Sequence, residues 1–180
     1  GQPATGFESN KVRALLAYLA VESARPHARE TLAGLLWPDY PDRAALSNLR
    51  SALANLRRAI GDPQADPPFL LITRDAIQFN IASDYSLDVA ALRDLARRPI
   101  DQLEQAVAAY RGDFLEGFSL ADSLPFEEWA LAQREHLRLV VVDALHRVAA
   151  FHETAGDPGQ AGAAARRALA LEPWDEEAHR

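Results

Sequence analysis

The chain has 180 residues, 48% of them hydrophobic, which is enough apolar material for one or two domains with cores of their own. Its 19 basic and 26 acidic residues give a net charge of −7, and it contains neither Cys nor Met. The lack of Cys excludes disulfides, thiolate chemistry and Cys-ligated metal sites. Neither an apolar run of about 18 residues nor a signal peptide occurs, so we expect a cytoplasmic protein without a membrane partner. Because Gly1 stands where an initiator Met would, we expect an excised fragment.

The negative charge is distributed unevenly along the chain. Residues 1–80 hold nine basic and eight acidic residues, a balance of +1, whereas residues 81–180 hold ten basic and eighteen acidic residues, a balance of −8. Between residues 43 and 74 five Arg stand against two Asp, a balance of +3. Opposite-signed halves favour an N-terminal module that faces a polyanion, followed by an acidic module that a polyanion repels.

The N-terminal part begins with three predicted helices. Apolar spacing predicts helices over residues 11–21 and 29–36. The sequence WPDYPD at residues 37–42 predicts a loop, because Pro disfavours helix in the residue before it. A longer helix is predicted over residues 43–60, and it ends at the Gly-Asp-Pro sequence that starts at Gly61.

The helix predicted over residues 43–60 has two unlike faces. At 100° per residue, its apolar stripe consists of Leu46, Leu49, Leu53, Leu56 and Ile60. The opposite arc has short or basic side chains and no acid, and consists of Ala44, Ser47, Asn48, Ser51, Ala54, Asn55 and Arg58. Such an arc can approach a polyanion closely. The alternative is an ordinary helix that packs on one side and is solvated on the other.

Two short β-prone runs, residues 69–73 and 76–81, flank Arg74 and predict a hairpin with this Arg near its tip. Helix, helix, loop, longer helix and hairpin is the order of a winged helix-turn-helix. In that motif the third helix enters the major groove of DNA and the hairpin wing contacts the DNA beside it. We therefore predict a DNA-binding domain over residues 1–84, with double-stranded DNA as the partner.

The candidate DNA contacts differ in their chemistry. Candidates for base contact lie on the open arc and are Asn48, Ser51, Asn55 and Arg58, because Arg can bond guanine, and Asn adenine, in bidentate fashion. Ser47 shares this arc. Arg50 and Arg57 fall at the edge of the apolar stripe, where they can reach phosphates or pair with acids. The phosphate candidates on charge alone are Arg43, Arg74 and Lys11.

The rest of the chain is predicted to be a helical domain over residues 85–180. Its expected elements are helices over 88–98 and 101–110, a loop over 111–124, a long helix from Pro125 to about residue 155, a helix over 160–171, and one that starts at Pro173. From residue 142 onward, spacing fits a tetratricopeptide (TPR) register, with Gly156 in the turn between two helices. The small residues Ala161, Ala165 and Ala168 line its second helix. The fold class is thus mainly α, a winged helix-turn-helix followed by an all-α TPR-like domain.

Several blocks of sequence resemble a known family. KVRALLAYLA at residues 11–20, RETLAGLLWPD at 29–39 and LRSALANLRRAIG at 49–61 resemble the winged-helix domain of SARP-type bacterial transcriptional regulators, which are OmpR-like. The matching blocks of the second half are YRGDFL at 110–115, FEEW at 126–129, REHL at 134–137 and the stretch 156–180. These resemble the bacterial transcriptional activator domain that follows the winged helix in the family.

The resemblance implies a transcriptional regulator, an activator by family, that recognises DNA through residues 43–60 and self-associates on DNA as paired monomers at direct repeats. In OmpR-like proteins the loop before the recognition helix touches RNA polymerase, which implies a contact through Asp39, Tyr40 and Asp42. Trp37, in the same loop, is expected to plug the core. The family also has strands before its first helix, for which only residues 1–10 remain here.

Nothing in the sequence predicts catalysis, a cofactor or a metal. The five His lack ligand spacing such as HExxH, and the single Lys, Lys11, has no phosphate-binding Gly-rich loop beside it. Two alternatives stay open at this point. One is a protein-interaction scaffold in which the winged helix is only structural, and the other is a regulatory fragment of an enzyme.

Overall fold

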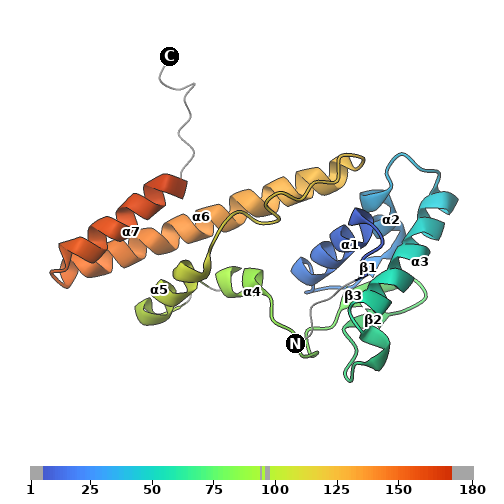
Figure 1. The fold of residues 1–180 in the computed structure, drawn as a ribbon, viewed down its shortest axis with the longest axis horizontal. Coiled ribbons are helices and arrows are strands. Elements are labelled where there is room, and N and C mark those ends of the chain that lie inside the picture. Colours follow the sequence, from blue (N-terminus) through green and yellow to red (C-terminus); the bar gives the residue numbers. More distant parts are fainter. Residues whose placement is uncertain (1–5, 94, 96–97, 172–180) are drawn as a thin grey trace, which may run out of the picture. The chain divides into compact units, whose positions relative to one another are not determined.

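The computed structural model describes residues 6–93, 95 and 98–171, shown as coloured ribbon in Figure 1. The chain divides into two compact units. The winged unit consists of Gly1–Leu87 and Gly117–Ala130, and the helical unit consists of Asp88–Glu116 and Leu131–Arg180. None of the helices in the described residues has both the length and the apolar run needed to cross a bilayer.

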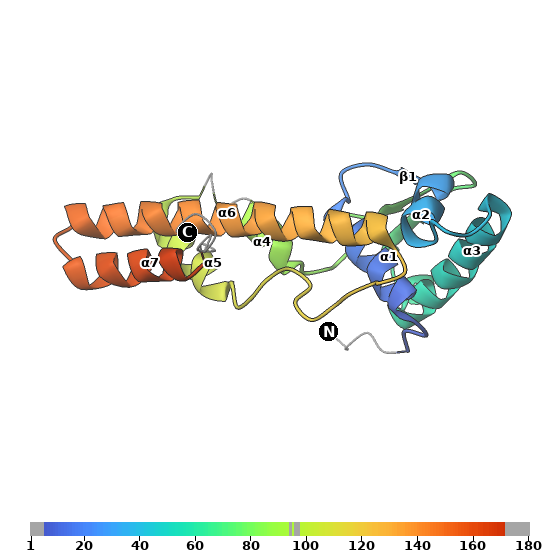
Figure 2. The same ribbon diagram turned by 90° about the horizontal axis from the view of Figure 1, so that it is seen from above.

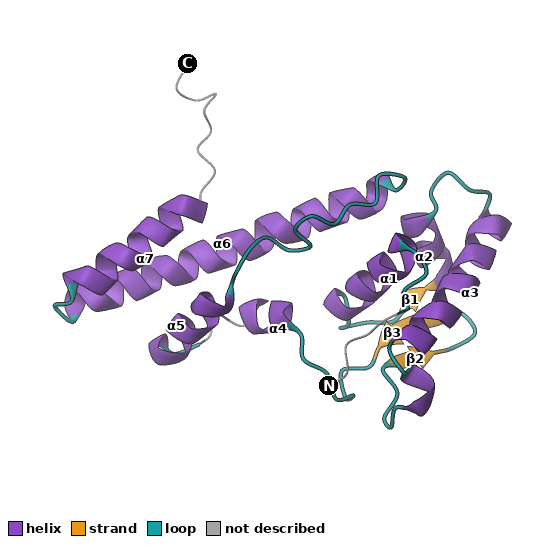
Figure 3. Ribbon diagram, in the orientation of Figure 1, coloured by secondary structure: helices purple, strands orange, loops and turns teal. Residues whose placement is uncertain are grey.

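The winged unit has three helices on a small antiparallel sheet, as the sequence predicts (Figure 3). The helices are α1 (Asn10–Val21), α2 (Arg29–Leu36) and α3 (Asp42–Ala59). The hairpin consists of β2 (Leu70–Ile72) and β3 (Ala76–Phe79). A two-residue strand, β1 (His27–Ala28), pairs with β3 and gives the order β1-β3-β2. Sequence analysis missed β1 because two residues carry no periodicity. No strand precedes α1 among residues 6–9.

The core of the winged unit is aliphatic and lies between the helices and the sheet. Leu15 and Leu19 of α1, Leu32 and Leu36 of α2, and Ile77 of β3 are completely buried. Burying each such side chain contributes about 1.5–3 kcal/mol, an upper estimate. The core therefore fixes α1 and α2 as the support on which α3 packs.

The end of α3 is tied to the wing. Gly61 has a φ of +69°, a left-handed conformation that glycine adopts without strain and that ends the helix. Asp62 follows, and its buried carboxylate accepts hydrogen bonds from Arg57 Nε at 2.7 Å and from the backbone N–H of Leu70 at 2.9 Å. One side chain thus joins the last turn of α3 to the first residue of β2.

The helical unit contains α4 (Asp88–Arg93), α5 (Ile100–Ala109), most of α6 (Leu124–Thr154) and α7 (Pro158–Leu171). Of the helix predicted over 88–98, α4 covers Asp88–Arg93. Residues 94, 96 and 97 lie outside the described residues, as does the helix predicted from Pro173. The loop predicted over residues 111–124 is confirmed up to residue 123, and α6 already begins at Leu124.

The pair α6–α7 has the geometry that the TPR register predicts. Gly156 has a φ of +75° in the turn, and α7 returns alongside the second half of α6 (Figure 2). Ala161 and Ala168 are buried, while Ala165 is only half-buried. Ala164 takes the buried place instead of Ala165, so one of the three predicted contact positions on α7 is wrong.

Candidate nucleic-acid interface

Helix α3 turns a row of Arg and Ser side chains toward solvent. Its exposed residues are Asp42, Arg43, Ser47, Arg50, Ser51, Ala54, Arg57 and Arg58, and its buried ones are Ala45, Leu49, Ala52, Leu53, Asn55 and Leu56. Beyond the first turn, the exposed side contains no acid. At 100° per residue, the buried side is rotated by roughly 50° from the stripe predicted from Leu and Ile alone.

The rotation has a physical cause in two small residues. Ala45 and Ala52 are 3% and 7% exposed, so they form part of the contact of α3 with the rest of the winged unit. Because Ala has a small side chain, it permits close approach of neighbouring helices, although hydrophobicity ranks it below Leu. Consequently Arg50 lies on the open side of α3 rather than at the edge of the core, and Leu46 is only half-buried.

Asn55 does not lie on the open side, contrary to the prediction. It is 4% exposed, and its side-chain oxygen accepts a hydrogen bond from the Glu8 backbone N–H while its nitrogen donates to the Gly6 carbonyl, both at 3.1 Å. The segment before α1 therefore covers Asn55 and uses its amide as a two-point clasp. Because Asn55 is buried and its amide is bonded on both sides, the amide does not face the open side of α3 in this conformation.

The other predicted base contacts are placed differently from one another. Ser47 and Ser51 are exposed, and the Ser51 hydroxyl donates back to the Ser47 carbonyl at 3.3 Å. Asn48 is half-buried. Arg58 is exposed and pairs with the equally exposed carboxylate of Glu8 at 3.1 Å. An ion pair between such exposed groups contributes little to stability, so Arg58 can exchange Glu8 for another acceptor at low cost.

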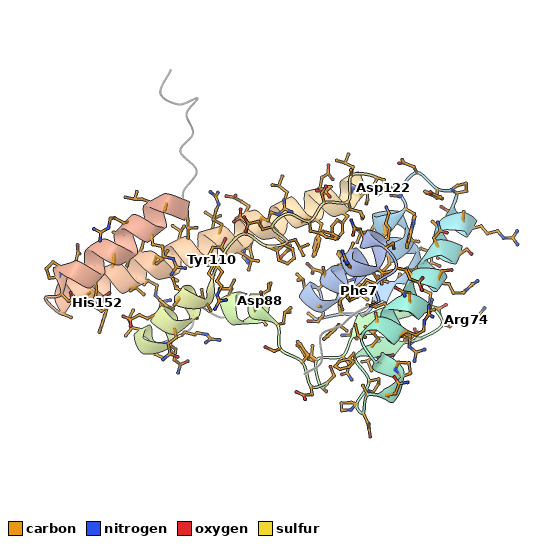
Figure 4. All side chains as sticks on the ribbon, in the orientation of Figure 1. Phe7, Arg74, Asp88, Tyr110, Asp122 and His152 are labelled. Carbon is orange, nitrogen blue, oxygen red and sulfur yellow. The ribbon has the colours of Figure 1, made fainter. Side chains whose placement is uncertain are left out.

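A hollow of about 430 Å³ lies between α3 and the wing and is the clearest candidate site in the described residues. Its charged lining consists only of arginines, Arg50 and Arg57 from α3, Arg74 from the hairpin tip and Arg29 from the start of α2. Figure 4 labels Arg74 on the wing beside α3. The apolar floor consists of Leu53, Ala54 and Ile72. Four guanidinium groups around one hollow produce a positive potential that attracts anions.

Arg29 was missed as a site residue by sequence analysis. Its Nη2 donates to the Thr73 carbonyl of the wing at 3.0 Å, and its Nε is buried without a hydrogen-bond partner in the described structure. An unpaired buried N–H is costly, so this atom of a groove residue stands out from the satisfied polar atoms around it. The sequence signal was weak, a single Arg at the start of α2, which no periodicity separates from a solvated residue.

We call this hollow the arginine groove, after Arg29, Arg50, Arg57 and Arg74, which line it. These arginines differ in the groups that they currently bind. Arg57 gives only its Nε to Asp62, which leaves the rest of its five donors. Arg50 and Arg74 are exposed. The groove therefore combines the half-buried Arg29, Arg57 paired with Asp62, and the exposed Arg50 and Arg74. That arrangement suits a polyanion that passes between the helix and the wing, because α3, the start of α2 and the hairpin tip all contribute positive charge.

The turn before α3 divides into a buried and an exposed part. Trp37 is 8% exposed and belongs to the core, as predicted. Asp39, Tyr40 and Asp42 are all exposed, so they are accessible to a partner. Lys11, by contrast, was a phosphate candidate and is placed elsewhere. Its ammonium is directed to the end of α2 and to Asp122, which withdraws it from the exposed face of α3.

The sequence of the second half decides the family. Residues 75–180 match the model of the bacterial transcriptional activator domain, which is more than half of the chain. The chain belongs to the bacterial transcriptional activator domain family. Members of this family are transcriptional regulators and not enzymes, and the resemblance to SARP-type regulators is confirmed.

Curated relatives and a solved structure agree with the family. The transcriptional regulatory protein EmbR of Mycobacterium bovis and of Mycobacterium tuberculosis is 34% identical over 61 residues, which are 34% of this chain and 16% of EmbR. The structure of M. tuberculosis EmbR in complex with a low-affinity phosphopeptide matches with a TM-score of 0.55 at 20% identity. That match covers 97% of this chain and 63% of the EmbR chain, and it shows a common fold. The chain thus spans less than two thirds of the EmbR length.

Proposed function

We propose that the chain is a sequence-specific DNA-binding transcriptional regulator whose α3 enters the major groove while the β2–β3 hairpin lies against the backbone as a wing. The observation that carries the proposal is the arginine groove between these two elements. A duplex presents phosphates on either side of its major groove. Guanidinium groups beside a helix in that groove can therefore bind phosphate oxygens in bidentate fashion. A role on DNA also implies a cytoplasmic location.

The two sides of the interface have different tasks in this proposal. Arg29, Arg50, Arg57 and Arg74 bind phosphates, which supplies affinity without sequence preference. Base edges are read by Ser47, Ser51 and Arg58, which are exposed outside the groove, and Arg43, exposed in the first turn of α3, is a further phosphate contact. Arg58 releases Glu8 when it binds a base. Asn55 holds the segment before α1 in place rather than reading a base.

The test is selection of genomic DNA fragments by the purified chain at several salt concentrations. A variant with Arg50→Ala and Arg74→Ala runs in parallel, and Arg25→Ala, an exposed Arg outside the groove, serves as the control. The parent and the control should enrich one shared motif. The double variant should bind every fragment more weakly, with a smaller salt dependence. If the parent enriches no motif, the interaction-scaffold alternative replaces this proposal.

Base reading by Arg58 is tested on the selected motif. Arg58→Ala should cost roughly 1–3 kcal/mol on the motif and relax the preference at one position. Glu8→Gln removes the competing carboxylate and should strengthen binding slightly while leaving the preference unchanged. Equal losses for Arg58→Ala on the motif and on scrambled DNA would show that Arg58 binds a phosphate instead.

The exposed residues before α3 are proposed to contact RNA polymerase. Asp39 and Tyr40 lie in the α2–α3 turn and Asp42 is the first residue of α3, all of them outside the lining of the arginine groove. Changing all three to Ala should reduce transcription from a promoter that carries the selected motif and leave DNA affinity unchanged. We also propose binding as paired monomers at direct repeats, for which sedimentation with one or two copies of the motif gives the stoichiometry. Loss of DNA affinity in the triple variant would argue against a separate polymerase contact.

A further inference from the structure

Lys11 is the centre of a small charged cluster at the C-terminal end of α2. Its ammonium donates to the Leu36 carbonyl and pairs with Asp122 Oδ1 at 2.9 Å, and it lies 5.8 Å from the centre of the Trp37 ring. Only 12% of the Lys11 side chain is exposed. The single lysine of the chain is therefore committed to the interior of the winged unit.

The end of a helix is where such a cation has the greatest effect. The last carbonyls of a helix have no partner within it, and the helix dipole places partial negative charge there. Lys11 supplies a donor and a positive charge to α2 at this point. The hydroxyl of Ser123, which is completely buried, donates to the neighbouring Leu35 carbonyl. Asp122 therefore acts on α2 through Lys11, which donates to the Leu36 carbonyl, whereas Ser123 donates to the Leu35 carbonyl itself.

The residues after this cluster form the turn that leads into α3. The Trp37 N–H bonds to the Ala33 carbonyl at 2.8 Å, and Tyr40 N–H bonds to the Trp37 carbonyl at 3.2 Å. The Pro41 carbonyl then accepts from the first turn of α3. Hydrogen bonds thus hold both ends of the short connection between α2 and α3, which leaves it little freedom to change the direction in which α3 begins.

Asp122 and Ser123 come from a segment that is itself firmly anchored in the winged unit. In this segment, residues 117–130, Phe126 is 1% exposed, and the Trp129 ring lies 5.0 Å from the Tyr18 ring of α1. The indole N–H of Trp129 donates to Glu22 at 3.0 Å. Figure 4 labels Asp122 at the start of α6. The segment belongs to the part of the chain that matches the family, whereas Lys11 precedes that part.

We propose that Asp122 and Ser123 are positioning residues for the recognition helix, because they hold the C-terminal end of α2 and with it the turn into α3. The DNA-binding module then consists of the winged helix together with residues 117–130. This inference rests on the proposed DNA-binding function, although the effect on the turn can be measured without DNA. The activator-domain sequence in this way contributes directly to the geometry of DNA recognition.

The experiment compares the full chain with Asp122→Ala, Asp122→Glu and Ser123→Ala. Asp84→Ala, an exposed acid of the winged unit, is the matched control. Amide hydrogen exchange of the turn and the fluorine NMR signal of a fluorotryptophan at Trp37 report on the end of α2. The Trp37→Phe variant assigns that signal. Affinity for the motif selected above reports on the recognition helix, and melting shows that each variant is folded.

We expect Asp122→Ala and Ser123→Ala to speed amide exchange at Trp37 and Tyr40 and to shift the fluorine signal. Affinity for the motif should fall by about threefold to tenfold, with no change in salt dependence, because no phosphate contact is lost. Asp122→Glu should restore most of the exchange protection, since it restores the partner of Lys11. Asp84→Ala should behave like the parent.

The inference is overturned if the alanine variants keep the parent's exchange rates and fluorine signal. It is also overturned if the exchange rates and the fluorine signal change while affinity for the motif stays the same, because the turn then does not determine the orientation of α3. If the parent itself binds no DNA, the proposed function fails. Exchange and fluorine data still decide in that case whether Asp122 and Ser123 hold the turn.

Discussion

The two units of the chain use most of their arginines in different ways. In the winged unit, Arg29, Arg50, Arg57 and Arg74 line an open groove without any acid in its lining. In the helical unit, Arg134, Arg138, Arg147 and Arg167 each donate to main-chain carbonyls and are only half-exposed. Arg134, for example, donates to the Phe114 and Leu115 carbonyls at 2.7 and 3.2 Å.

The difference lies in what the backbone leaves unpaired. The connections of the helical unit are irregular, and their carbonyls need donors from elsewhere. A guanidinium carries five donors on a long stem and can serve two carbonyls at once. In the described part of the winged unit Lys11 and Ser123 serve the last carbonyls of α2, and of the four groove arginines only Arg29 donates to a carbonyl, so most of their donors remain for solvent and for anions. Net charge by unit is therefore a poor guide to binding, since the partners of each Arg decide its task.

The largest effect is expected where an arginine serves the backbone. Arg134→Met removes donors from two carbonyls and should lower the free energy of unfolding by about 3 kcal/mol. Urea denaturation followed by circular dichroism measures the change. Arg166→Met, an exposed arginine on α7, should change it by less than about 0.5 kcal/mol. If both substitutions lower the free energy of unfolding equally, the hydrogen bonds of Arg134 to the backbone do not explain its role in the helical unit.

The second prediction concerns the arginine groove. Arg50→Ala with Arg74→Ala should weaken DNA binding by about tenfold or more and reduce the slope of log affinity against log salt by about 2. The free energy of unfolding should stay within about 0.5 kcal/mol of the parent, because both side chains are exposed. Filter binding over a salt series and urea denaturation give the two values. A loss of stability without a change in slope would mean that these arginines also serve the fold.

The third prediction separates a structural amide from a base reader. Asn55→Ala removes two hydrogen bonds to the segment before α1 and should cost about 1 kcal/mol of stability. Binding to the selected motif and to scrambled DNA should fall by equal factors in competition assays. Ser51→Ala, on the exposed side of the same helix, is the comparison for an accessible position. If Asn55→Ala alone loses preference for a base at one position of the motif, Asn55 reads a base, as the sequence predicted.

The smallest effect is expected at high pH in the helical unit. Burial, together with the hydrogen bond to Asp113, raises the pKa of Tyr110 from 10.0 to about 12. Between these values the folded chain keeps the phenolic proton and the unfolded chain loses it, so stability falls as pH rises through this window. Tyr110→Phe should flatten that part of the melting profile and cost less than about 1 kcal/mol at neutral pH.

The control for this pH effect is Tyr40→Phe, since Tyr40 is 51% exposed. Melting temperatures measured for the three proteins between pH 10 and 12 should show a flatter profile only for Tyr110→Phe. If the Tyr40 variant flattens the profile equally, the alkaline loss of stability does not come from Tyr110.

Local periodicity accounts for the features that could be predicted. The bounds of α1, α2 and the hairpin follow from apolar spacing and from Pro and Gly, which act over a few residues. The rotation of α3 did not follow, because Ala45 and Ala52 make the closest contacts although Leu is more hydrophobic. Asn55 was misplaced for another reason, since a segment 47 residues earlier in the chain covers it.

Long-range pairings explain what remained outside sequence analysis. Lys11 and Asp122 are 111 positions apart by number, and neither has neighbours that indicate the other. Arg29 and Arg134 stand in similar helical sequences, but one lines a groove and the other serves a loop. Only the packing of distant elements distinguishes them. Arg50, Arg57 and Arg74 could therefore be predicted as site residues from charge and helical spacing, while Arg29 could not.

The carboxylate of Asp62 fixes the spacing between α3 and the hairpin. Because it bonds to both Arg57 and Leu70, the offset between α3 and the wing cannot stretch or shrink without breaking a buried interaction. In the proposed complex, a duplex that contacts both parts would have to adjust its own groove width and twist. The stiffness of DNA then enters the choice of binding site, even at base pairs that no side chain touches.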